Sequence, residues 1–365
     1  MEGSASDHHW MRRALLLARR QAGRTWPNPT VGCCIVRDGH LLGEAVHAGP
    51  GHPHAEAAVL LALAAHRIDP AGATAYITLE PCHHQGRTAP CSRALAEAGI
   101  SRVVYAAPDD TPRHPGGGGA WLRENSVEVQ PGVFGNLARE LNHPFFETSS
   151  DSEPHLTLKL AMSADGALAR RAGRIEAVAE RAITGQRTRR RVHRMRAGAN
   201  AVIVGAATAR ADHPRLDVRE LVDGSWSGVQ PQPVVLAGRH PLETGEVPGR
   251  ALIMAGADGP RLPGSLRVLR ATTRPGGRLD WESVLALLLA EGCGILLVEG
   301  GASVAADLLA ERPPHRIHLY LAACGFGPGS VKLPGGLRLD DRYETLRARR
   351  LGSDVEWVLR RRDLG

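Results

Sequence analysis

The stretch that decides the fold of the first half of the chain is TLEPCHHQGRTAPC, residues 78–91, read together with PHAEAA, residues 53–58. It contains Cys82 and Cys91, which are separated by HHQGRTAP. Such a pair could form a redox couple, pack in a core, or supply two ligands to a metal ion whose third ligand is His54. The polar, turn-rich surroundings of these two cysteines favour the metal site.

A catalytic zinc ion is typically held by three nitrogen or sulfur ligands and keeps a fourth position for water. We expect His54 at the start of a helix, Cys82 in the turn after a strand, and Cys91 directly before the next helix. These three element ends can converge at one edge of a sheet, where helix N-termini stabilise thiolates. Glu56 can reach the same cleft and exchange a proton with the metal-bound water, whose pKa zinc lowers to about 7. This pattern is typical of the zinc deaminases.

The longer loop between the two cysteines narrows the family. Three motifs resemble the deaminase domain of the bifunctional pyrimidine deaminase–reductases of riboflavin biosynthesis, namely PNPTVGC at 27–33, HAE at 54–56 and PCHHQGRTAPC at 81–91. The resemblance implies that one zinc ion is bound by His54, Cys82 and Cys91, and that Glu56 is the catalytic proton shuttle. It also implies a substrate pocket lined by Asn28, His47, His84 and Arg87. A guanidinium suits a phosphorylated pyrimidine because it can hold phosphate through two hydrogen bonds.

Strands that alternate with helices predict an α/β sandwich around one sheet for the first half. Asp38-Gly39 predicts a hairpin between the first two strands, and GGGG at 116–119 predicts a flexible loop. Helices are expected at 10–22, 54–65, 92–98 and 134–147. The resemblance makes this half a cytidine-deaminase-like α/β/α sandwich. We expect it to span 1–147, followed by a linker at 148–154, TSSDSEP, and a second domain at 155–365.

The second half also resembles this family, in its reductase domain. The motifs are LKLAMSADGALA at 158–169, ANAVIVGAATARADHPRLDVR at 199–219 and LLVEGGASVAADLL at 296–309. The resemblance implies a dihydrofolate-reductase-like α/β fold and an NADPH-dependent reduction of a ribosyl chain to a ribityl chain. In such an enzyme the cofactor carries the hydride, and the protein orients and polarises the substrate.

The expected reductase residues fall into three groups. Two are expected to act in catalysis: Asp212, as a proton relay, and Lys159, which could polarise the ring-opened carbonyl. Four are expected to contact the substrate, with the two arginines as phosphate clamps: Arg196, Leu216, Arg219 and Glu299. Six are expected to contact NADPH: Ala161, Thr184, Thr208, Asp212, Gly300 and Gly301. The two glycines join a strand to a helix, whose free N–H groups suit a pyrophosphate, although a tight turn would explain them equally well.

Several positions depart from the pattern of the family. Thr111 stands where the deaminase domain usually has asparagine, and Ala182 stands where the reductase domain usually has tryptophan. Glu180 replaces a serine expected near the substrate phosphate, which its charge would repel, and His213 replaces the second aspartate of DDP. These changes leave open a diverged paralogue whose deaminase works and whose reductase is impaired or retargeted.

The 365 residues carry a net charge of +7, much of it in the arginine-rich run at 187–196. This run could be a solvated helix face, a phosphate-binding element or a nucleic-acid face, but no aromatic residues are interleaved to stack bases. We therefore expect a small-molecule substrate and no nucleic acid. The sequence has no long apolar segment, so we expect no membrane span and a cytoplasmic protein. It leaves open a homo-oligomer, the choice between NADPH and NADH, and a purely structural zinc site that would need His83 or His84 as a fourth ligand.

Overall fold

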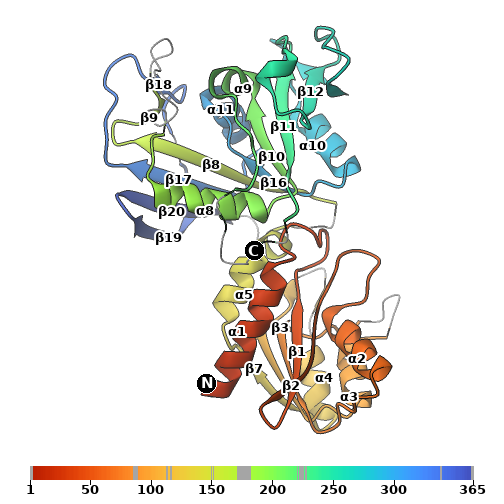
Figure 1. Ribbon diagram of the computed structural model, residues 1–365. Coiled ribbons are helices and arrows are strands. Elements are labelled where there is room, and N and C mark those ends of the chain that lie inside the picture. The colour runs from red at the N-terminus through yellow and green to blue at the C-terminus, as the bar shows by residue number, and fades with distance from the viewer. Residues whose placement is uncertain are drawn as a thin grey trace. The chain divides into compact units, whose positions relative to one another are not determined.

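The structure is a computed structural model that describes residues 3–84, 89–111, 114–115, 117–148, 150, 152–170, 182–219, 221, 226, 228–337 and 339–362. The chain divides into two compact units (Figure 1). The first comprises Met1–Asp151 with Val222–Gly228, and the second comprises Ser152–Leu221 with Val229–Gly365. The linker expected at 148–154 and the boundaries on either side of it stay a prediction.

A five-stranded sheet in the order β2-β1-β3-β4-β7 forms the centre of the first unit. Its strands are β1 (Gly32–Arg37), β2 (His40–Val46), β3 (Thr74–Leu79), β4 (Arg102–Ala107) and β7 (Glu128–Pro131). β1 pairs antiparallel with β2 and β3, whereas β3, β4 and β7 are parallel. The expected hairpin is confirmed, since Asp38 and Gly39 have φ of 53° and 76° at the β1–β2 turn, as a tight two-residue hairpin turn requires.

Helices cover both faces of this sheet (Figure 1). They are α1 (Ala5–Arg19), α2 (Ala55–Ala65), α3 (Cys91–Glu97), α4 (Gly118–Glu124), α5 (Gly135–Leu141) and α6 (His143–Phe146). α1 and α5 lie on one face, while α2, α3 and α4 lie on the other (Figure 1). The core between them is built from small and branched residues such as Ala14, Ile35, Val59 and Ile77. The predicted α/β/α sandwich is therefore confirmed.

Three local expectations for the first unit are corrected. α1 begins at Ala5 rather than residue 10, because Ser4 and Asp7 form a capping box at its start. The helix expected at 134–147 is two helices, α5 and α6, separated by Asn142. The side chain of Asn142 accepts a hydrogen bond from the backbone N–H of Thr30 and donates one to the Thr30 carbonyl oxygen. The expected flexible loop at 116–119 is wrong for its described part, since Gly118 and Gly119 begin α4.

The second unit is built on a nine-stranded sheet in the order β13-β12-β11-β10-β16-β8-β17-β20-β19. Neighbouring strands from β13 to β17 are parallel, and β20 pairs antiparallel with β17 and β19. The strands are β8 (His155–Ser163), β10 (Ala201–Gly205), β11 (Gln232–Gly238), β12 (Leu252–Gly256), β13 (Arg267–Ala271), β16 (Ile295–Val298), β17 (Arg316–Ala322), β19 (Tyr343–Leu351) and β20 (Asp354–Arg361). Short two-stranded pairs are formed by β5 (Asp110–Thr111) with β6 (His114–Pro115) in the first unit, and by β9 (Ala167–Ala169) with β18 (Val331–Lys332) and β14 (Thr273–Arg274) with β15 (Arg278–Leu279) in the second.

Alternate residues of the central strands face two separate cores, as expected for a parallel sheet covered on both sides. Ala201 and Ile203 of β10 face one core, whereas Val202 and Val204 face the other. The helices of this unit are α8 (Gln186–Ala197), α9 (Ala206–Asp212), α10 (Trp281–Ala290) and α11 (Ala302–Glu311), with a short 3-10 helix at Thr244–Glu246. α9 follows the carboxyl end of β10, and Glu299 follows the carboxyl end of β16. The expected reductase residues gather at this edge of the parallel strands.

Candidate functional site

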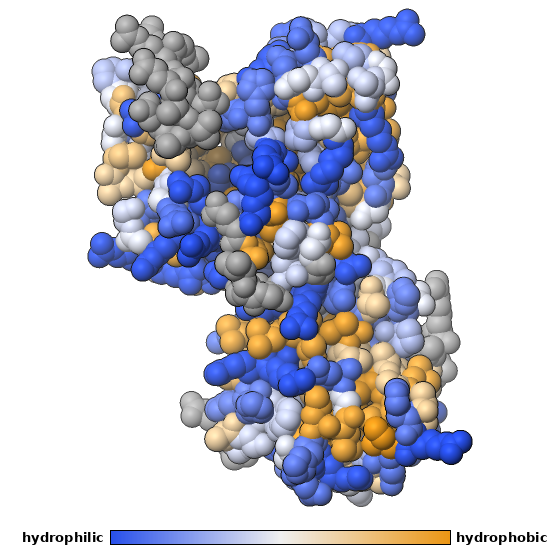
Figure 2. Space-filling model, in the orientation of Figure 1, coloured by the Kyte–Doolittle hydropathy of each residue, from blue (hydrophilic) through white to orange (hydrophobic). Residues whose placement is uncertain are grey.

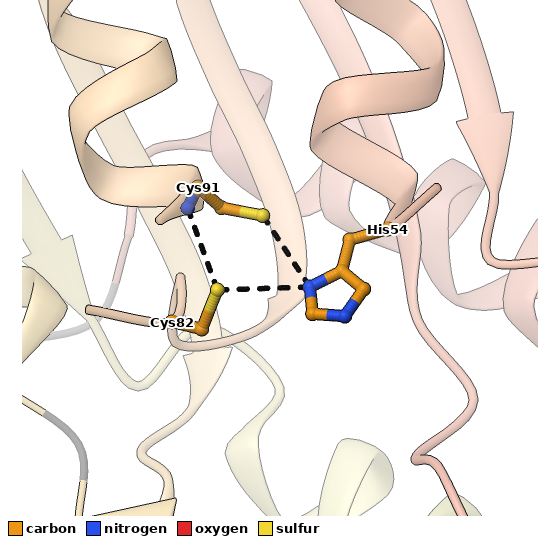
Figure 3. A group of neighbouring side chains, drawn as sticks. All are labelled: His54, Cys82 and Cys91. Atoms are coloured by element: carbon orange, nitrogen blue, oxygen red, sulfur yellow. Dashed lines mark hydrogen bonds between the residues drawn. The ribbon is translucent and has the colours of Figure 1, made fainter. Parts of the chain in front are cut away.

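His54, Cys82 and Cys91 lie together in the first unit, as the spacing predicts (Figure 3). His54 is the N-cap of α2, Cys82 follows β3, and Cys91 is the first residue of α3. The Nδ1 atom of His54 lies 3.6 Å from Sγ of Cys82 and 3.5 Å from Sγ of Cys91. Zinc bonds of about 2.3 Å to sulfur and about 2.0 Å to nitrogen, at a tetrahedral angle, put nitrogen and sulfur roughly 3.5 Å apart. The donor set and its spacing therefore fit one zinc ion.

The two thiols differ in their protonation. The backbone N–H of Cys91, at the N-terminus of α3, donates to Sγ of Cys82 at 3.4 Å. Hydrogen bonds from Cys91 and His54 lower the pKa of Cys82. The same pairing with Cys82, together with burial, raises the pKa of Cys91. A bound divalent cation favours the thiolate form of both cysteines. Before metal binds, the thiolate form is already favoured at Cys82 but not at Cys91.

Glu56 lies in the first turn of α2 and is 4% exposed. Burial raises its pKa to about 7, and the negative charge of Cys82 adds to the effect. A carboxyl group with a pKa near neutrality can both take up and release a proton under working conditions. The residue thus has the burial and the acidity that a proton shuttle needs.

A cavity of ≈ 120 Å³ adjoins this group. It brings together four of the residues predicted from the sequence, Asn28, His47, Glu56 and His84, with the metal ligands His54 and Cys82. Leu79, Glu80, Asp109 and Phe145 also line it. Arg87 lies outside the described residues, so its expected contact with phosphate stays a prediction.

His47 holds Asn28 in a defined orientation. Nδ1 of His47 lies 2.9 Å from the carbonyl oxygen of Pro53, which can only accept, so Nδ1 carries the proton. Nε2 then accepts from the Asn28 amide at 2.9 Å. Burial lowers the pKa of His47, in agreement with a neutral ring. The carbonyl oxygen of the Asn28 amide is left to accept a hydrogen bond from a ligand.

Glu80 is a residue of this site that the sequence reasoning missed. Its carboxylate accepts hydrogen bonds from the backbone N–H groups of Asp109, Gly117 and Gly119. It thereby ties the end of β3 to the segment that carries Asp109 and to the start of α4. The only signal in the sequence was a carboxylate placed directly between a predicted strand and Pro81. Thr111, one of the departures from the family pattern, donates to Asp109 at 3.0 Å and is buried beside this cavity residue.

A second cluster lies at the carboxyl ends of the strands in the second unit. Arg196 of α8 donates to Glu299, directly after β16, through Nε at 2.6 Å and through Nη2 at 2.9 Å. Nζ of Lys159, on β8, lies 3.8 Å from the same carboxylate. Burial lowers the pKa of Lys159. Although burial alone would raise it, Arg196 and Lys159 hold the pKa of Glu299 below its ordinary value.

The remaining predicted substrate residues surround this cluster. Asp217 accepts from Arg196 through its backbone carbonyl at 3.0 Å and forms an ion pair with Arg219. Leu216 is 1% exposed and its backbone is left-handed, with φ of 51°. Asp212, at the end of α9, is near enough to Lys159 for its charge to raise the pKa of that lysine. The individual roles assigned to these residues stay predictions.

The predicted cofactor residues Thr208, Gly300 and Gly301 come together. A Cβ added at Gly301 would lie 2.6 Å from Oγ1 of Thr208, so α9 and the start of α11 approach closely there. Gly301 is the N-cap of α11, whose free N–H groups form a site for phosphate groups. Ala161 lies on β8 and Thr184 just before α8. The close approach requires glycine at position 301, and the expected contact of these residues with the cofactor stays a prediction.

Comparison with known proteins decides the family. The family model for the RibD C-terminal domain matches residues 154–356, and the model for the cytidine and deoxycytidylate deaminase zinc-binding region matches residues 4–107. The riboflavin biosynthesis protein RibD of Aquifex aeolicus (strain VF5) is 34% identical, over 96% of this chain and 97% of its own length. The chain belongs to the RibD family. The RibD of Escherichia coli (strain K12) is 33% identical, over 96% of this chain and 98% of its own.

Solved structures agree with membership of the RibD family. A RibD structure from Acinetobacter baumannii matches with a TM-score of 0.70 and 31% identity, covering 98% of this chain and 99% of that one. A diaminohydroxyphosphoribosylaminopyrimidine deaminase/5-amino-6-(5-phosphoribosylamino)uracil reductase from Thermotoga maritima matches with a TM-score of 0.73 and 27% identity, covering 98% and 99%. The expected pairing of a zinc deaminase domain with an NADPH-dependent reductase domain is confirmed.

The positions that depart from the RibD pattern have different surroundings. Ala182 is exposed, and His213 ends α9 in a left-handed conformation, with φ of 43°. Glu180 lies outside the described residues. The comparisons do not favour the diverged-paralogue alternative over an ordinary RibD. No helix in the described part of the chain is long and apolar enough to cross a bilayer.

Proposed function

We propose that this chain catalyses two successive steps of riboflavin biosynthesis. The first is deamination of 2,5-diamino-6-ribosylamino-4(3H)-pyrimidinone 5′-phosphate to 5-amino-6-ribosylaminouracil 5′-phosphate. The second is NADPH-dependent reduction of the ribosyl chain to the ribityl chain. The observation that carries the proposal is the tetrahedral spacing of His54, Cys82 and Cys91 beside the buried carboxyl group of Glu56.

In the deaminase half, the chain's own residues hold the pyrimidine and move the protons. Zinc, when bound by the three ligands, supplies a water of lowered pKa. Glu56 would carry the protons of that water to the ring nitrogen and to the exocyclic amine, so that the oxygen of the water replaces the amine on the ring carbon and ammonia leaves. Asn28, oriented by His47, accepts a hydrogen bond from the ring, and His84 lines the same cavity. Asp109, held by Glu80, bounds the cavity on the side of α4.

In the reductase half, residues at the carboxyl ends of the strands hold and polarise the sugar. NADPH, when bound, supplies the hydride. The N-terminus of α11 and Thr208 hold its pyrophosphate. Lys159, whose pKa burial lowers, donates a hydrogen bond to the ring-opened carbonyl. Asp212 relays the proton that accompanies the hydride.

The substrate contacts of this half come from the Arg196–Glu299 pair and its neighbours. Glu299 presents its carboxylate to the sugar hydroxyls while Arg196 and Lys159 balance its charge. Arg219 and Arg196 hold the phosphate, and Leu216 completes the contact. We also place the deaminase domain at 1–147, a linker at 148–154 and the reductase domain at 155–365. We propose a cytoplasmic protein, which can be a monomer or a homo-oligomer.

One coupled assay tests the proposal. Purified protein with zinc is given the diamino substrate and NADPH, and ammonia release and the absorbance of NADPH are followed together. We expect one NADPH to be oxidised for each ammonia released once the intermediate has built up. Ammonia release without NADPH oxidation would refute the reductase half, and full turnover by Glu56→Ala would refute the deaminase assignment.

A further inference from the structure

Helix α8 is held on its sheet by polar contacts rather than by apolar burial. Its sequence is QRTRRRVHRMRA, and only Thr188, Val192 and His193 are buried. Hydrophilic residues dominate the surface over α8 and β19 (Figure 2). A helix with so little apolar surface gains little from hydrophobic packing. Its position must therefore depend on specific hydrogen bonds and ion pairs.

The N-terminus of α8 is capped by a residue from another element. Gly185, the N-cap, has no side chain to cap the helix. Asp354, the first residue of β20, is 2% exposed, and its Oδ2 accepts from Gly185 N at 2.8 Å and from Thr188 Oγ1 at 2.5 Å. A carboxylate there is also stabilised by the helix dipole. Asp354 thus fixes the first turn of α8 to the sheet.

The middle of α8 is held by a second carboxylate of the same strand. Glu356 is 0% exposed, and its Oε1 accepts from Nε of Arg191 at 3.0 Å. The same carboxylate accepts from Nε of Arg349 at 2.6 Å and from the Tyr320 hydroxyl at 3.1 Å. Asp354 and Glu356 are two residues apart on β20, so they project to the same face of the sheet. Together they hold α8 along more than one turn.

The last two turns of α8 support the reductase site. Arg196 donates to Glu299 and to the backbone carbonyl of Asp217. Nδ1 of His193 accepts from the backbone N–H of Arg219 at 3.3 Å. Any rotation or slide of α8 would therefore displace Arg196 and the segment at 217–219 together.

We propose that Asp354 and Glu356 are positioning residues for the reductase substrate, and that they act through α8 on Arg196 and Arg219. The inference rests on the proposed reductase function. Neither carboxylate touches the substrate in this scheme. They set where the guanidinium groups lie, so their loss weakens substrate binding more than it slows the hydride step.

The test changes the helix side of each contact, so that the buried carboxylates stay in place. Thr188→Val removes one hydrogen bond to Asp354, and Arg191→Met removes the ion pair with Glu356. Arg360→Met is the matched control, because Arg360 pairs with Glu344 on the same pair of strands and has no α8 residue as its partner in these contacts. Five quantities are measured in the full-length zinc-loaded protein: KM and kcat for reduction of the ribosylaminouracil phosphate, kcat for ammonia release, the melting temperature, and deuterium uptake by backbone amides at 213–219.

We expect Thr188→Val and Arg191→Met to raise KM about fivefold, with a smaller fall in the kcat of reduction and no change in ammonia release. Deuterium uptake at 213–219 should become faster in both. Arg191→Lys should recover part of the effect, and Arg360→Met should match the wild type. Asp354→Asn, which weakens the same contact from the strand side, should reproduce Thr188→Val.

Two results would overturn the inference. One is a lower melting temperature in these variants with KM and exchange at 213–219 unchanged, which would make the contacts merely structural. The other is equal loss in the Arg360→Met control. A wild-type protein that releases ammonia but oxidises no NADPH would instead refute the reductase function, and the exchange measurement would still decide whether α8 positions the segment at 217–219.

Discussion

Arg196 and Glu299 form a two-point ion pair, with Nε to Oε1 at 2.6 Å and Nη2 to Oε2 at 2.9 Å. The side chains of both are largely buried, at 13% and 7% exposed. A buried pair of this geometry is costly to break, because the partner that remains is a desolvated charge. In the proposed reductase site, the phosphate would therefore meet an Arg196 whose charge Glu299 already balances.

Arg196→Met should destabilise the second unit by about 3 kcal/mol, since Glu299 would keep Lys159 as its cationic neighbour at 3.8 Å. NADPH oxidation should fall sharply while ammonia release stays normal. Urea unfolding followed by tryptophan fluorescence, with both assays, measures these effects. Adding Glu299→Gln to Arg196→Met should restore part of the stability and none of the activity. Unchanged unfolding in the single variant would contradict the importance of the pair.

Glu56→Gln should lower the rate of ammonia release by about 10²–10⁴-fold, because the amide cannot carry the proton. The variant should still bind zinc, since the three ligands are untouched, and should still reduce the deaminated substrate when this is supplied. Metal analysis and the two separate assays measure these outcomes. A variant that loses zinc as well would show that Glu56 supports the ligands rather than moving protons.

Zinc binding should release more protons from the wild type than from Glu56→Gln at pH 6. The pKa of Glu56 is raised to about 7 by burial, so the group is mostly protonated at that pH, and a nearby cation favours its charged form. At pH 8.5 the group has already lost its proton, and the difference should vanish. Calorimetric titration of the metal-free proteins with zinc, in buffers of different ionisation enthalpy, counts the protons. An equal release at pH 6 would place the pKa of Glu56 elsewhere.

Asp7 should make the first unit sensitive to acid. Although burial alone would raise its pKa, hydrogen bonds from Arg102 and Ser4 lower it from 3.8 to about 2. The stabilisation is present above pH 4 and is lost as the pH falls towards 2, and amounts to about 2 kcal/mol at most. Unfolding of the wild type and Asp7→Asn between pH 2 and 6 measures it. The two curves should converge at the acid end, and parallel curves would contradict this assignment.

The metal centre could be predicted from the sequence because each ligand belongs to a short motif at the end of a helix or strand. His54, Cys82 and Cys91 each stand at the end of a helix or strand, and the order of these elements places them at one sheet edge. Alternating strands and helices predicted an α/β sandwich for the first half, whereas the fold expected for the second half came from its resemblance to the reductase domain of the family. Glu80 escaped because its partners, Asp109 and the backbone of 117–119, come from a segment whose course no short motif indicates.

The roles in the reductase half were harder to read. Arg196 and Glu299 were each expected to meet the substrate, yet their mutual pairing depends on the distance between α8 and β16, which the sequence does not give. The arginine-rich run at 187–196 was ambiguous for the same reason. Arg191 and Arg196 face buried carboxylates, whereas Arg187, Arg189 and Arg190 are exposed, and only the sheet beneath the helix separates the two sets.

Gly118 restricts which positions of this enzyme can be varied in a redesign. A methyl group at this position would lie 1.9 Å from the carbonyl oxygen of Pro81, the residue before a metal ligand. The first turn of α4 therefore packs directly against the backbone of the Pro81-Cys82 turn, and no space is left at Gly118 for even a methyl side chain. Libraries that seek new pyrimidine substrates should keep Gly118 and Gly119 constant and vary the cavity wall at Leu79 or Phe145 instead.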